Sequence, residues 1–223
     1  MGDHRPHGKR GHRTDPRQAW GPVRSTRRPG LVFGEIAGIC GSLRRDDLYP
    51  PIRSCLVRSW ASTLTGPVLD AGCGPGQWTG FLAQCGLTVS GIDLVPEFVE
   101  LARSRYPELS FDIGRFEESG AATGSLGGVM SWYTLIHHDP PDMGTPLAEF
   151  ARVIRPGGGL LVGFFEGPAV EPFDHAVTTA YRWSVDELGK ELAAAGFELI
   201  EAHTRRASGH RPHGAITARR RAV

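Results

Sequence analysis

The sequence predicts an α/β protein built on a doubly wound, mostly parallel sheet. Apolar, β-branched segments alternate along the chain with segments whose apolar residues recur at helical spacing, as strands and helices do in such sheets. A glycine-rich turn joins the first of these strands to the helix after it. The chain has 223 residues, of which 40% are hydrophobic, and this is enough to bury one substantial core.

The first strand, helix and strand lie within a short stretch. Residues 67–71 form an apolar run that indicates a buried strand, and residues 77–85 have the apolar spacing of a helix. Residues 87–92 predict a second strand, which ends at Asp93. Because two parallel strands joined in this way form a right-handed unit almost without exception, Asp93 is expected to lie beside the glycine turn.

Each later element is predicted from the same kinds of pattern. A helix is expected to begin at Pro96, since proline suits the first turn of a helix. The hydroxyl of Ser184 is expected to cap a later helix. The strands expected between these helices are residues 109–113, 127–132 and 160–165.

The turn after the first strand is the most informative segment of the chain. Residues 68–76 read VLDAGCGPG, and glycine allows the backbone to turn tightly and to approach a ligand. An acidic residue about twenty positions further on, here Asp93, can hold both hydroxyls of a ribose. The alternative is an ordinary tight turn followed by a capping Asp, but the strand before it and the helix after it favour a bound nucleoside.

The glycine spacing distinguishes two kinds of nucleoside site. Dinucleotide-binding turns have the pattern G-x-G-x-x-G and place a pyrophosphate at a helix N-terminus. Here the glycines run G-x-G-x-G, and Pro75 lacks an N–H that could bind a phosphate. An NAD(P)-dependent oxidoreductase is therefore the disfavoured alternative.

Several segments together resemble the class I S-adenosylmethionine-dependent methyltransferases. Residues 68–76 and Asp93 resemble the first two motifs of that family, and residues 128–138 and 147–161 resemble its fourth strand and its later helix, glycine turn and fifth strand. The likeness runs from residue 67 to the C-terminus and extends to small-molecule enzymes of the kind found in actinobacteria. It implies a Rossmann-like sheet of seven strands, and its antiparallel C-terminal hairpin would comprise residues 197–204 and 215–218.

The resemblance also implies S-adenosyl-L-methionine as the cofactor. Asp70 would help to hold its ammonium group, directly or through water, and Asp93 would hold the ribose hydroxyls. Many relatives use an Asp after the third strand to bind the adenine amine, but Arg115 at this position cannot accept that hydrogen bond, which leaves the backbone around Phe116 and the side chain of Glu117. The complete expected set is Asp70, Gly72, Cys73, Gly74, Gly76, Gln77, Trp78, Asp93, Leu94, Arg115, Phe116 and Trp132.

The residues expected at the methyl acceptor follow the fourth strand. Tyr133, His137 and His138 come after Trp132, and a histidine can remove a proton from a hydroxyl or amine near neutral pH. A structural role is the alternative for each histidine, and periodicity does not decide which of the two faces the cleft. The predicted reaction is in-line transfer of a methyl group to oxygen or nitrogen of a small molecule.

A second acceptor-side patch is expected after the fifth strand. The connection over residues 167–183 is long and rich in aromatic residues. Such segments commonly cover an active site. An aromatic lining would suit an uncharged or weakly polar molecule. The expected members of the patch are Phe164, Phe165, Glu166, His175, Tyr181, Arg182 and Trp183.

The charge distribution defines the expected domains and partners. Residues 1–30 hold 8 basic and 2 acidic residues, residues 205–223 hold 6 arginines, and the body between them holds 11 basic and 22 acidic residues. An acidic body disfavours nucleic acid, whose phosphates require basic charge. The expected organisation is a disordered tail over residues 1–30, cap or lid helices over 31–66 and a methyltransferase domain over 67–223, with the basic C-terminal residues solvated.

The remaining features favour a cytoplasmic enzyme without a metal site. No apolar run reaches the roughly 18 residues that a membrane span requires, and no apolar segment of a secretory signal follows the basic N-terminus. The four cysteines lack the spacing of a metal site or of a disulfide framework. A protein with the methyltransferase fold that binds partners without catalysis is the remaining alternative.

Overall fold

The computed structural model describes residues 51–175, 179–206 and 211–222. The predicted tail, residues 1–30, lies outside these ranges, as does most of the predicted cap, residues 31–66.

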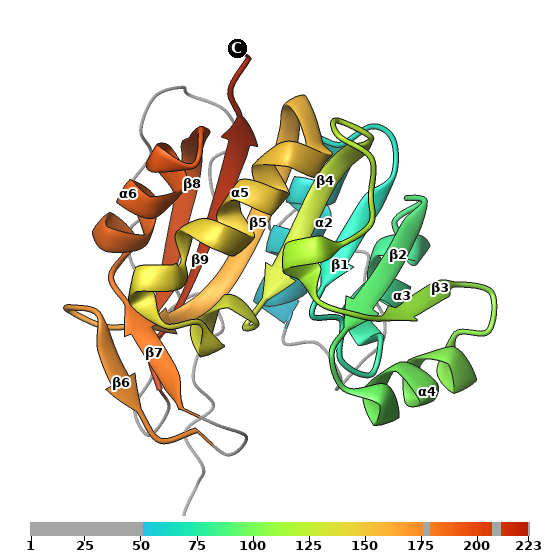
Figure 1. The fold of residues 1–223 in the computed structure, drawn as a ribbon, viewed down its shortest axis with the longest axis horizontal. Coiled ribbons are helices and arrows are strands. Elements are labelled where there is room, and N and C mark those ends of the chain that lie inside the picture. Colours follow the sequence, from blue (N-terminus) through green and yellow to red (C-terminus); the bar gives the residue numbers. More distant parts are fainter. Residues whose placement is uncertain (1–50, 176–178, 207–210, 223) are drawn as a thin grey trace, which may run out of the picture.

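The described residues form helices and strands that alternate around one sheet (Figure 1). The helices are α2 (Pro51–Ser62), α3 (Gln77–Gln84), α4 (Pro96–Arg105), α5 (Gly144–Val153) and α6 (Val185–Ala194), and the 3-10 turns are η2 (Phe116–Glu118), η3 (Leu135–His137) and η4 (Pro140–Asp142). The strands are β1 (Val68–Ala71), β2 (Val89–Asp93), β3 (Ser110–Ile113), β4 (Leu126–Trp132), β5 (Ile154–Glu166), β6 (Glu171–Phe173), β7 (Ala180–Trp183), β8 (Phe197–Arg205) and β9 (His213–Arg220).

The sheet topology confirms the predicted fold class. Strands β3, β2, β1, β4 and β5 are parallel neighbours in that order, and β9 pairs antiparallel with both β5 and β8. These seven strands are the predicted parallel sheet and its C-terminal hairpin. The described sheet has nine strands in all, because β6 and β7 form a further antiparallel hairpin within residues 167–183.

The additional hairpin lies at the carboxyl end of the parallel strands (Figure 1). Strand β4 ends at Trp132, which pairs with Gly163, whereas β7 pairs with the two later β5 residues Phe165 and Glu166. The hairpin thus extends the sheet beyond the end of β4. Strands this short and without clear alternation leave little signal in a sequence, which explains why they were not predicted.

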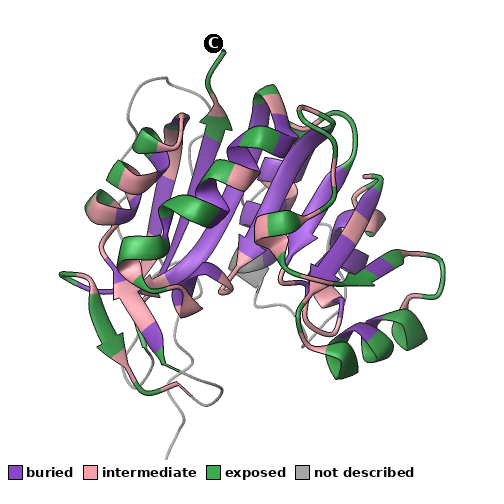
Figure 2. Cartoon of the chain, viewed as in Figure 1, coloured by how far each residue is buried: buried purple, intermediate pink, exposed green. Residues whose placement is uncertain are grey.

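Each face of the sheet is covered by its own apolar core. Val129 in β4 packs into a core with Phe150 of α5 and Leu188 of α6, whereas its neighbour Met130 packs with Trp60 of α2 and residues of α3. Successive strand residues point to opposite faces, so the central strands are buried on both sides (Figure 2). This explains their continuous apolar runs in the sequence.

The termini of two helices agree with the sequence predictions. Ser184 caps α6, and its Oγ accepts the Glu187 N–H at 3.1 Å. Pro96 is the first residue of α4. In the described part of the chain, no helix has the length and apolarity needed to cross a bilayer.

The hairpin strand predicted over residues 215–218 is confirmed and extends over residues 213–220, so the prediction that the basic C-terminal residues are solvated is wrong for this segment. These residues form β9 between β5 and β8. Residues 214–218 are buried, and Arg220 Nε donates to the Ala151 carbonyl at 2.6 Å. Small apolar side chains allow this segment to occupy the interior of the sheet in spite of its flanking arginines.

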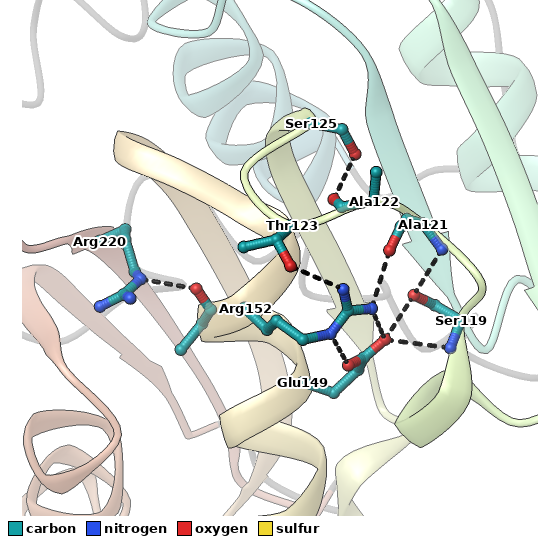
Figure 3. Close-up of polar contacts among 9 residues, drawn as sticks. Ser119, Ala121, Ala122, Thr123, Ser125, Glu149, Arg152 and Arg220 are labelled. Carbon is teal, nitrogen blue, oxygen red and sulfur yellow. Dashed lines mark hydrogen bonds and ion pairs between the residues drawn. The ribbon is translucent and has the colours of Figure 1, made fainter.

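A polar network ties the segment before β4 to α5 (Figure 3). The Arg152 guanidinium donates to Glu149 in the same helix, with Nε–Oε2 at 2.6 Å, and also to the Ala121 carbonyl at 2.8 Å. Ser119 donates to Glu149 through both its hydroxyl and its N–H, and hydrogen bonds from Arg152 and Ser119 hold the pKa of Glu149 below its usual value. The network therefore fixes the chain just after η2, close to the predicted adenine loop.

Candidate functional site

All three glycines of the turn after β1 have left-handed backbone conformations. The φ angles are +79° at Gly72, +53° at Gly74 and +81° at Gly76. A Cβ at Gly72 would overlap the Thr134 side chain, and one at Gly76 would lie 3.0 Å from Ala102 and Phe111. No heavy atom lies within 4 Å of the equivalent point at Gly74, so Gly74 alone faces open space.

Asp93 lies against this turn, which confirms the predicted geometry. Its Oδ2 accepts the Gly74 N–H at 2.8 Å, and its Oδ1 accepts the Val95 N–H at 3.0 Å. A carboxylate has about four acceptor sites, so both oxygens can accept further hydrogen bonds. The end of β2 therefore presents a fixed anionic group beside the open position at Gly74.

Asp70 is buried beneath the turn. Its side chain is 1% exposed, and its Oδ2 accepts the Thr79 hydroxyl at 2.7 Å. Burial raises the pKa of Asp70 to about 7 and the nearby Asp93 charge adds to the rise, whereas the hydrogen bond from Thr79 opposes it. The hydrogen bond to Thr79 joins β1 to α3. Because its side chain has so little exposed surface, Asp70 does not present a carboxylate to a ligand in the described structure.

We expect Asp70→Asn to change how stability depends on pH. A carboxyl whose pKa is raised from 3.8 to about 7 stays protonated in the folded state while the unfolded chain ionises, so it lowers stability as pH rises through this window. The loss is at most about 1.4 kcal/mol per pH unit for one group. Urea unfolding should show that the variant gains stability relative to the wild type between pH 4 and pH 7, and a constant difference would contradict this.

Two further residues predicted at the cofactor, Cys73 and Trp78, also have buried side chains. Cys73 packs with Val99 and Phe111, and burial raises the pKa of its thiol. Trp78 packs against Trp132 at 5.4 Å between ring centroids and belongs to the core beneath α2 and α3. These side chains support the turn from below, while Gln77 is the first residue of α3.

The predicted adenine loop contains a charged cluster. Arg115 Nη2 donates to Glu117 Oε1 at 2.8 Å, and the same oxygen lies 3.6 Å from His138 Nε2. Burial lowers the pKa of His138, although the Glu117 charge opposes this. Glu117 is therefore already engaged, and Phe116 packs at 5.3 Å from the His138 ring.

Two exposed apolar side chains lie near the end of β2. Leu94 is 60% exposed and follows Asp93 directly, and Ile113 is 52% exposed and pairs with Asp93 in the β2–β3 register. Leu94 was predicted from the sequence, but Ile113 was not. Its position next to Asp93 depends on the strand register, which the sequence alone does not reveal.

Tyr133 has the one positive φ among the non-glycine residues that the structure describes, at 61°. An aromatic residue in this conformation is strained by about 1–3 kcal/mol, and such strain is found disproportionately at functional sites. The Tyr133 N–H donates to the Gly163 carbonyl at 2.9 Å, and its hydroxyl lies 2.7 Å from His213 Nδ1. The chain thus holds this phenol in a fixed place after β4.

The two candidate histidines face different surroundings. The ring of His137 lies 5.2 Å from His175, and its Nδ1 lies 3.2 Å from the Thr179 carbonyl. His138 instead contacts Phe116 and Glu117. His137 therefore belongs to the side of the β6–β7 hairpin, and His138 to the side of the adenine loop.

An aromatic cluster gathers at the carboxyl end of β4 and β5. Phe165 lies 5.0 Å from Tyr133 and 5.3 Å from Phe173. The Arg211 guanidinium lies 4.7 Å from the Phe173 ring centre. We use the term aromatic cluster for Tyr133, Phe165, Phe173, His175 and His213.

The predicted acceptor-side patch is divided between the two faces of β5. Phe164 and Trp183 are buried in the core under α5 and α6, and Glu166 pairs with Arg206 at 2.9 Å beside a different cavity. Of the predicted members, Phe165 and His175 belong to the aromatic cluster, and the Arg182 guanidinium lies 5.1 Å from the Phe173 ring centre. Phe164, Glu166 and Trp183 lie elsewhere, because alternate strand residues point in opposite directions.

Three comparisons with known proteins agree with this geometry. A family model described as a methyltransferase domain matches residues 68–158. A magnesium-protoporphyrin O-methyltransferase of Rhodobacter capsulatus is 28% identical over 175 residues, which cover 67% of this chain and 76% of that protein. A ubiquinone biosynthesis O-methyltransferase of Xanthomonas oryzae is 32% identical over 117 residues, 50% of this chain and 48% of the relative.

The domain match begins at β1 and so includes the glycine turn and Asp93. Residues 68–158 therefore constitute a methyltransferase domain, and the chain is similar to S-adenosylmethionine-dependent methyltransferases. This decides between the nucleoside-binding alternatives in favour of the methyl donor.

The methyltransferase also has the fold of solved relatives. The structure of a 1,6-didemethyltoxoflavin-N1-methyltransferase from Burkholderia thailandensis, with bound 1,6-didemethyltoxoflavin and S-adenosylhomocysteine, matches with a TM-score of 0.64 at 23% identity. The match covers 90% of this chain and 95% of the other. The sheet and its C-terminal hairpin are therefore those of a known methyltransferase architecture.

Proposed function

We propose that this methyltransferase transfers a methyl group to oxygen or nitrogen of a small molecule that carries an aromatic ring. The supporting observation is the strained Tyr133, whose phenol lies in the aromatic cluster. Thr134, the next residue, packs against Gly72 of the glycine turn. A donor at the turn and an acceptor at the cluster would therefore be adjacent.

The residues at the turn fit the methyl donor. Gly74 has open space where a side chain would stand, and Asp93 has acceptor sites for two ribose hydroxyls. The exposed Leu94 and Ile113 offer apolar surface for the adenine. When bound, S-adenosylmethionine supplies a methyl carbon that is activated by its sulfonium charge.

Asp70 and Glu117 have supporting roles in this proposal. Asp70 holds α3 against β1 through Thr79, and Glu117 joins Arg115 to the surroundings of His138. Each carboxylate keeps a segment of the donor site in place. Direct contact between Asp70 and the ammonium group is not part of the proposal, because the side chain is 1% exposed.

The acceptor surface combines aromatic rings with positive charge. Arg211 lies over both Phe173 and Phe165, and Arg182 lies 5.1 Å from the Phe173 ring centre. A guanidinium over a ring favours electron-rich or acidic groups nearby. We therefore infer an aromatic acceptor with an acidic or electronegative substituent, in place of the uncharged molecule expected from the sequence.

The protein would contribute mainly by alignment. Orientation of two reactants can lower a barrier by about 7–11 kcal/mol in favourable cases, whereas a general base typically contributes about 10²- to 10⁴-fold. The fixed backbone of Tyr133 and the ring packing around it serve the first purpose. The similarity to a magnesium-protoporphyrin O-methyltransferase and to a 1,6-didemethyltoxoflavin-N1-methyltransferase supports a small-molecule acceptor.

Two measurements test the proposed function. Calorimetric titration should show binding of S-adenosylhomocysteine and none of NAD. Radiolabelled S-adenosylmethionine should then transfer its methyl group to members of a panel of phenols, catechols, anilines and aromatic carboxylates. Binding of S-adenosylhomocysteine with no labelled product from this panel or from a bacterial metabolite extract would contradict the proposal.

The two histidines should respond differently to substitution. We expect His137→Ala to lower kcat about tenfold or more with unchanged affinity for S-adenosylhomocysteine, because His137 contacts the acceptor-side residue His175. His138→Ala should mainly weaken that affinity, since His138 packs on the adenine loop. Initial rates and calorimetry on both variants check this, and identical changes in the two would contradict the assignment.

We further propose that the acceptor is not nucleic acid and that the enzyme acts in the cytoplasm. Between residues 31 and 204 the chain has 22 acidic and 11 basic residues, and phosphate binding requires the opposite balance. A filter-binding assay with labelled DNA and RNA tests the first point, and cell fractionation tests the second.

A further inference from the structure

The hydroxyl of Tyr133 is paired with a histidine from a distant part of the chain. His213 is the first residue of β9, eighty positions after Tyr133, and its Nδ1 lies 2.7 Å from the Tyr133 oxygen. The rings lie 5.5 Å apart at an interplanar angle of 79°. This distance is that of a good O–H···N hydrogen bond.

Both partners are held by the framework. His213 pairs with Phe165 across the β5–β9 ladder, and their ring centres lie 5.3 Å apart. Tyr133 is fixed by its strained backbone and by its ring contact with Phe165, which packs against both partners. The pair is therefore preorganised by the sheet and does not depend on a mobile loop.

When the imidazole is neutral, its tautomer decides which group donates and which accepts the hydrogen bond. With its proton on Nε2, His213 accepts through Nδ1, and the Tyr133 hydroxyl donates. A phenol oxygen that donates one hydrogen bond can also accept another through its lone pairs. This capacity is what Tyr133 needs to bind the O–H or N–H of an acceptor molecule within the aromatic cluster.

We propose that His213 is a positioning residue that orients the Tyr133 hydroxyl and receives its proton while Tyr133 takes the proton of the methyl acceptor. This inference rests on the proposed function. It assigns a role to a C-terminal strand residue whose side chain was not among the predicted site residues.

The transfer balances in atoms and electrons. The electron pair of the acceptor oxygen or nitrogen forms the bond to the methyl carbon, and the pair of the broken carbon–sulfur bond stays on sulfur. The acceptor proton passes to Tyr133 Oη, and the Tyr133 proton passes to His213 Nδ1. The positive charge lost from the sulfonium thus reappears on the imidazolium, which releases its proton to solvent from the ring.

Other charged groups surround this pair, and they would influence its proton transfer. The Arg211 guanidinium lies over the Phe165 ring, and the His175 ring centre lies 5.9 Å from that of Phe165. The His137 ring centre lies 5.2 Å from that of His175. Arg205 pairs with His213 across the β8–β9 ladder, and Glu166 follows Phe165 but binds Arg206 instead.

The first test observes the pair without any acceptor. In ¹⁵N-histidine NMR of the full chain, Tyr133→Phe should shift the Nδ1 resonance of His213, because the hydrogen-bond donor is lost while the ring remains. His213→Asn identifies the resonances of His213 by their loss, and His203→Asn on the neighbouring strand β8 identifies those of His203. Unchanged His213 resonances in Tyr133→Phe would overturn the pairing.

The second test measures turnover with whichever phenol or aniline of the panel is methylated. His213→Asn keeps a polar group near the Nδ1 position but cannot take a proton, so we expect kcat to fall about 100-fold with little change in KM. Tyr133→Phe should cause a similar loss, and the double variant should lose little more, since the two residues act as one unit. His203→Asn should retain full activity.

The outcomes separate the pair from the proposed function. Wild-type kcat in His213→Asn would overturn the proton-receiving role, as would additive losses in the double variant. Unchanged binding of S-adenosylhomocysteine in His213→Asn, measured by calorimetry, would show that the loss is not one of folding. A wild-type enzyme that methylates no compound would contradict the proposed function and this role with it, whereas the NMR shift decides the pairing independently.

Discussion

Asp93→Ala is expected to weaken binding of S-adenosylhomocysteine about 100-fold. The Asp93 carboxylate holds the Gly74 N–H at 2.8 Å and is proposed to accept both ribose hydroxyls. Hydrogen bonds to a charged group are each worth about 1.5–3 kcal/mol, so loss of the pair corresponds to about 2.7 kcal/mol or more in affinity. Isothermal titration calorimetry measures the change directly.

Two further variants make the Asp93 result specific. Asp93→Asn keeps one oxygen and should bind with intermediate affinity, because the charge is lost while one acceptor remains. Glu108→Ala removes an exposed carboxylate just before the first residue of β3, whereas Asp93 pairs with the last residue of that strand. This variant should bind S-adenosylhomocysteine as the wild type does. Equal losses in Asp93→Ala and Glu108→Ala would indicate a general charge effect and contradict the ribose contact.

The donor side of the site could be predicted because its signals are local. The turn at Gly72, Gly74 and Gly76 requires backbone conformations that glycine adopts without strain, so the residues themselves record the geometry. Asp93 follows from one right-handed strand, helix and strand unit. Neither inference needs knowledge of how distant strands pair.

The acceptor side depends on contacts between distant segments. Tyr133 and His213 meet because β9 inserts beside β5, and this register is set by packing of the complete sheet. The short strands β6 and β7 bring Phe173 into the cluster, yet their sequences show no alternation. The sequence predicted that residues 167–183 cover the site, but it did not distinguish Phe165, which joins the aromatic cluster, from Phe164, which is fully buried in the core under α5 and α6.

Donor binding should be especially sensitive to Gly74→Ala. The φ of +53° at Gly74 is strained for alanine, but no heavy atom lies within 4 Å of the new Cβ, so the folded protein should lose only about 1–2 kcal/mol. The methyl group would occupy the open space beside Asp93. We expect the affinity for S-adenosylhomocysteine to fall at least about tenfold, which corresponds to about 1.4 kcal/mol.

Gly86→Ala provides the matched control. Gly86 follows α3, has a φ of +87°, and likewise has no heavy atom within 4 Å of its Cβ position. Both variants therefore carry a similar backbone strain, and urea unfolding should give similar losses of stability. Positive φ and open space are common to both glycines. If only Gly74→Ala weakens binding of S-adenosylhomocysteine, the ligand therefore occupies the space beside Gly74. Similar affinities in the two variants would mean that the donor does not occupy the space beside Gly74, and would contradict this prediction.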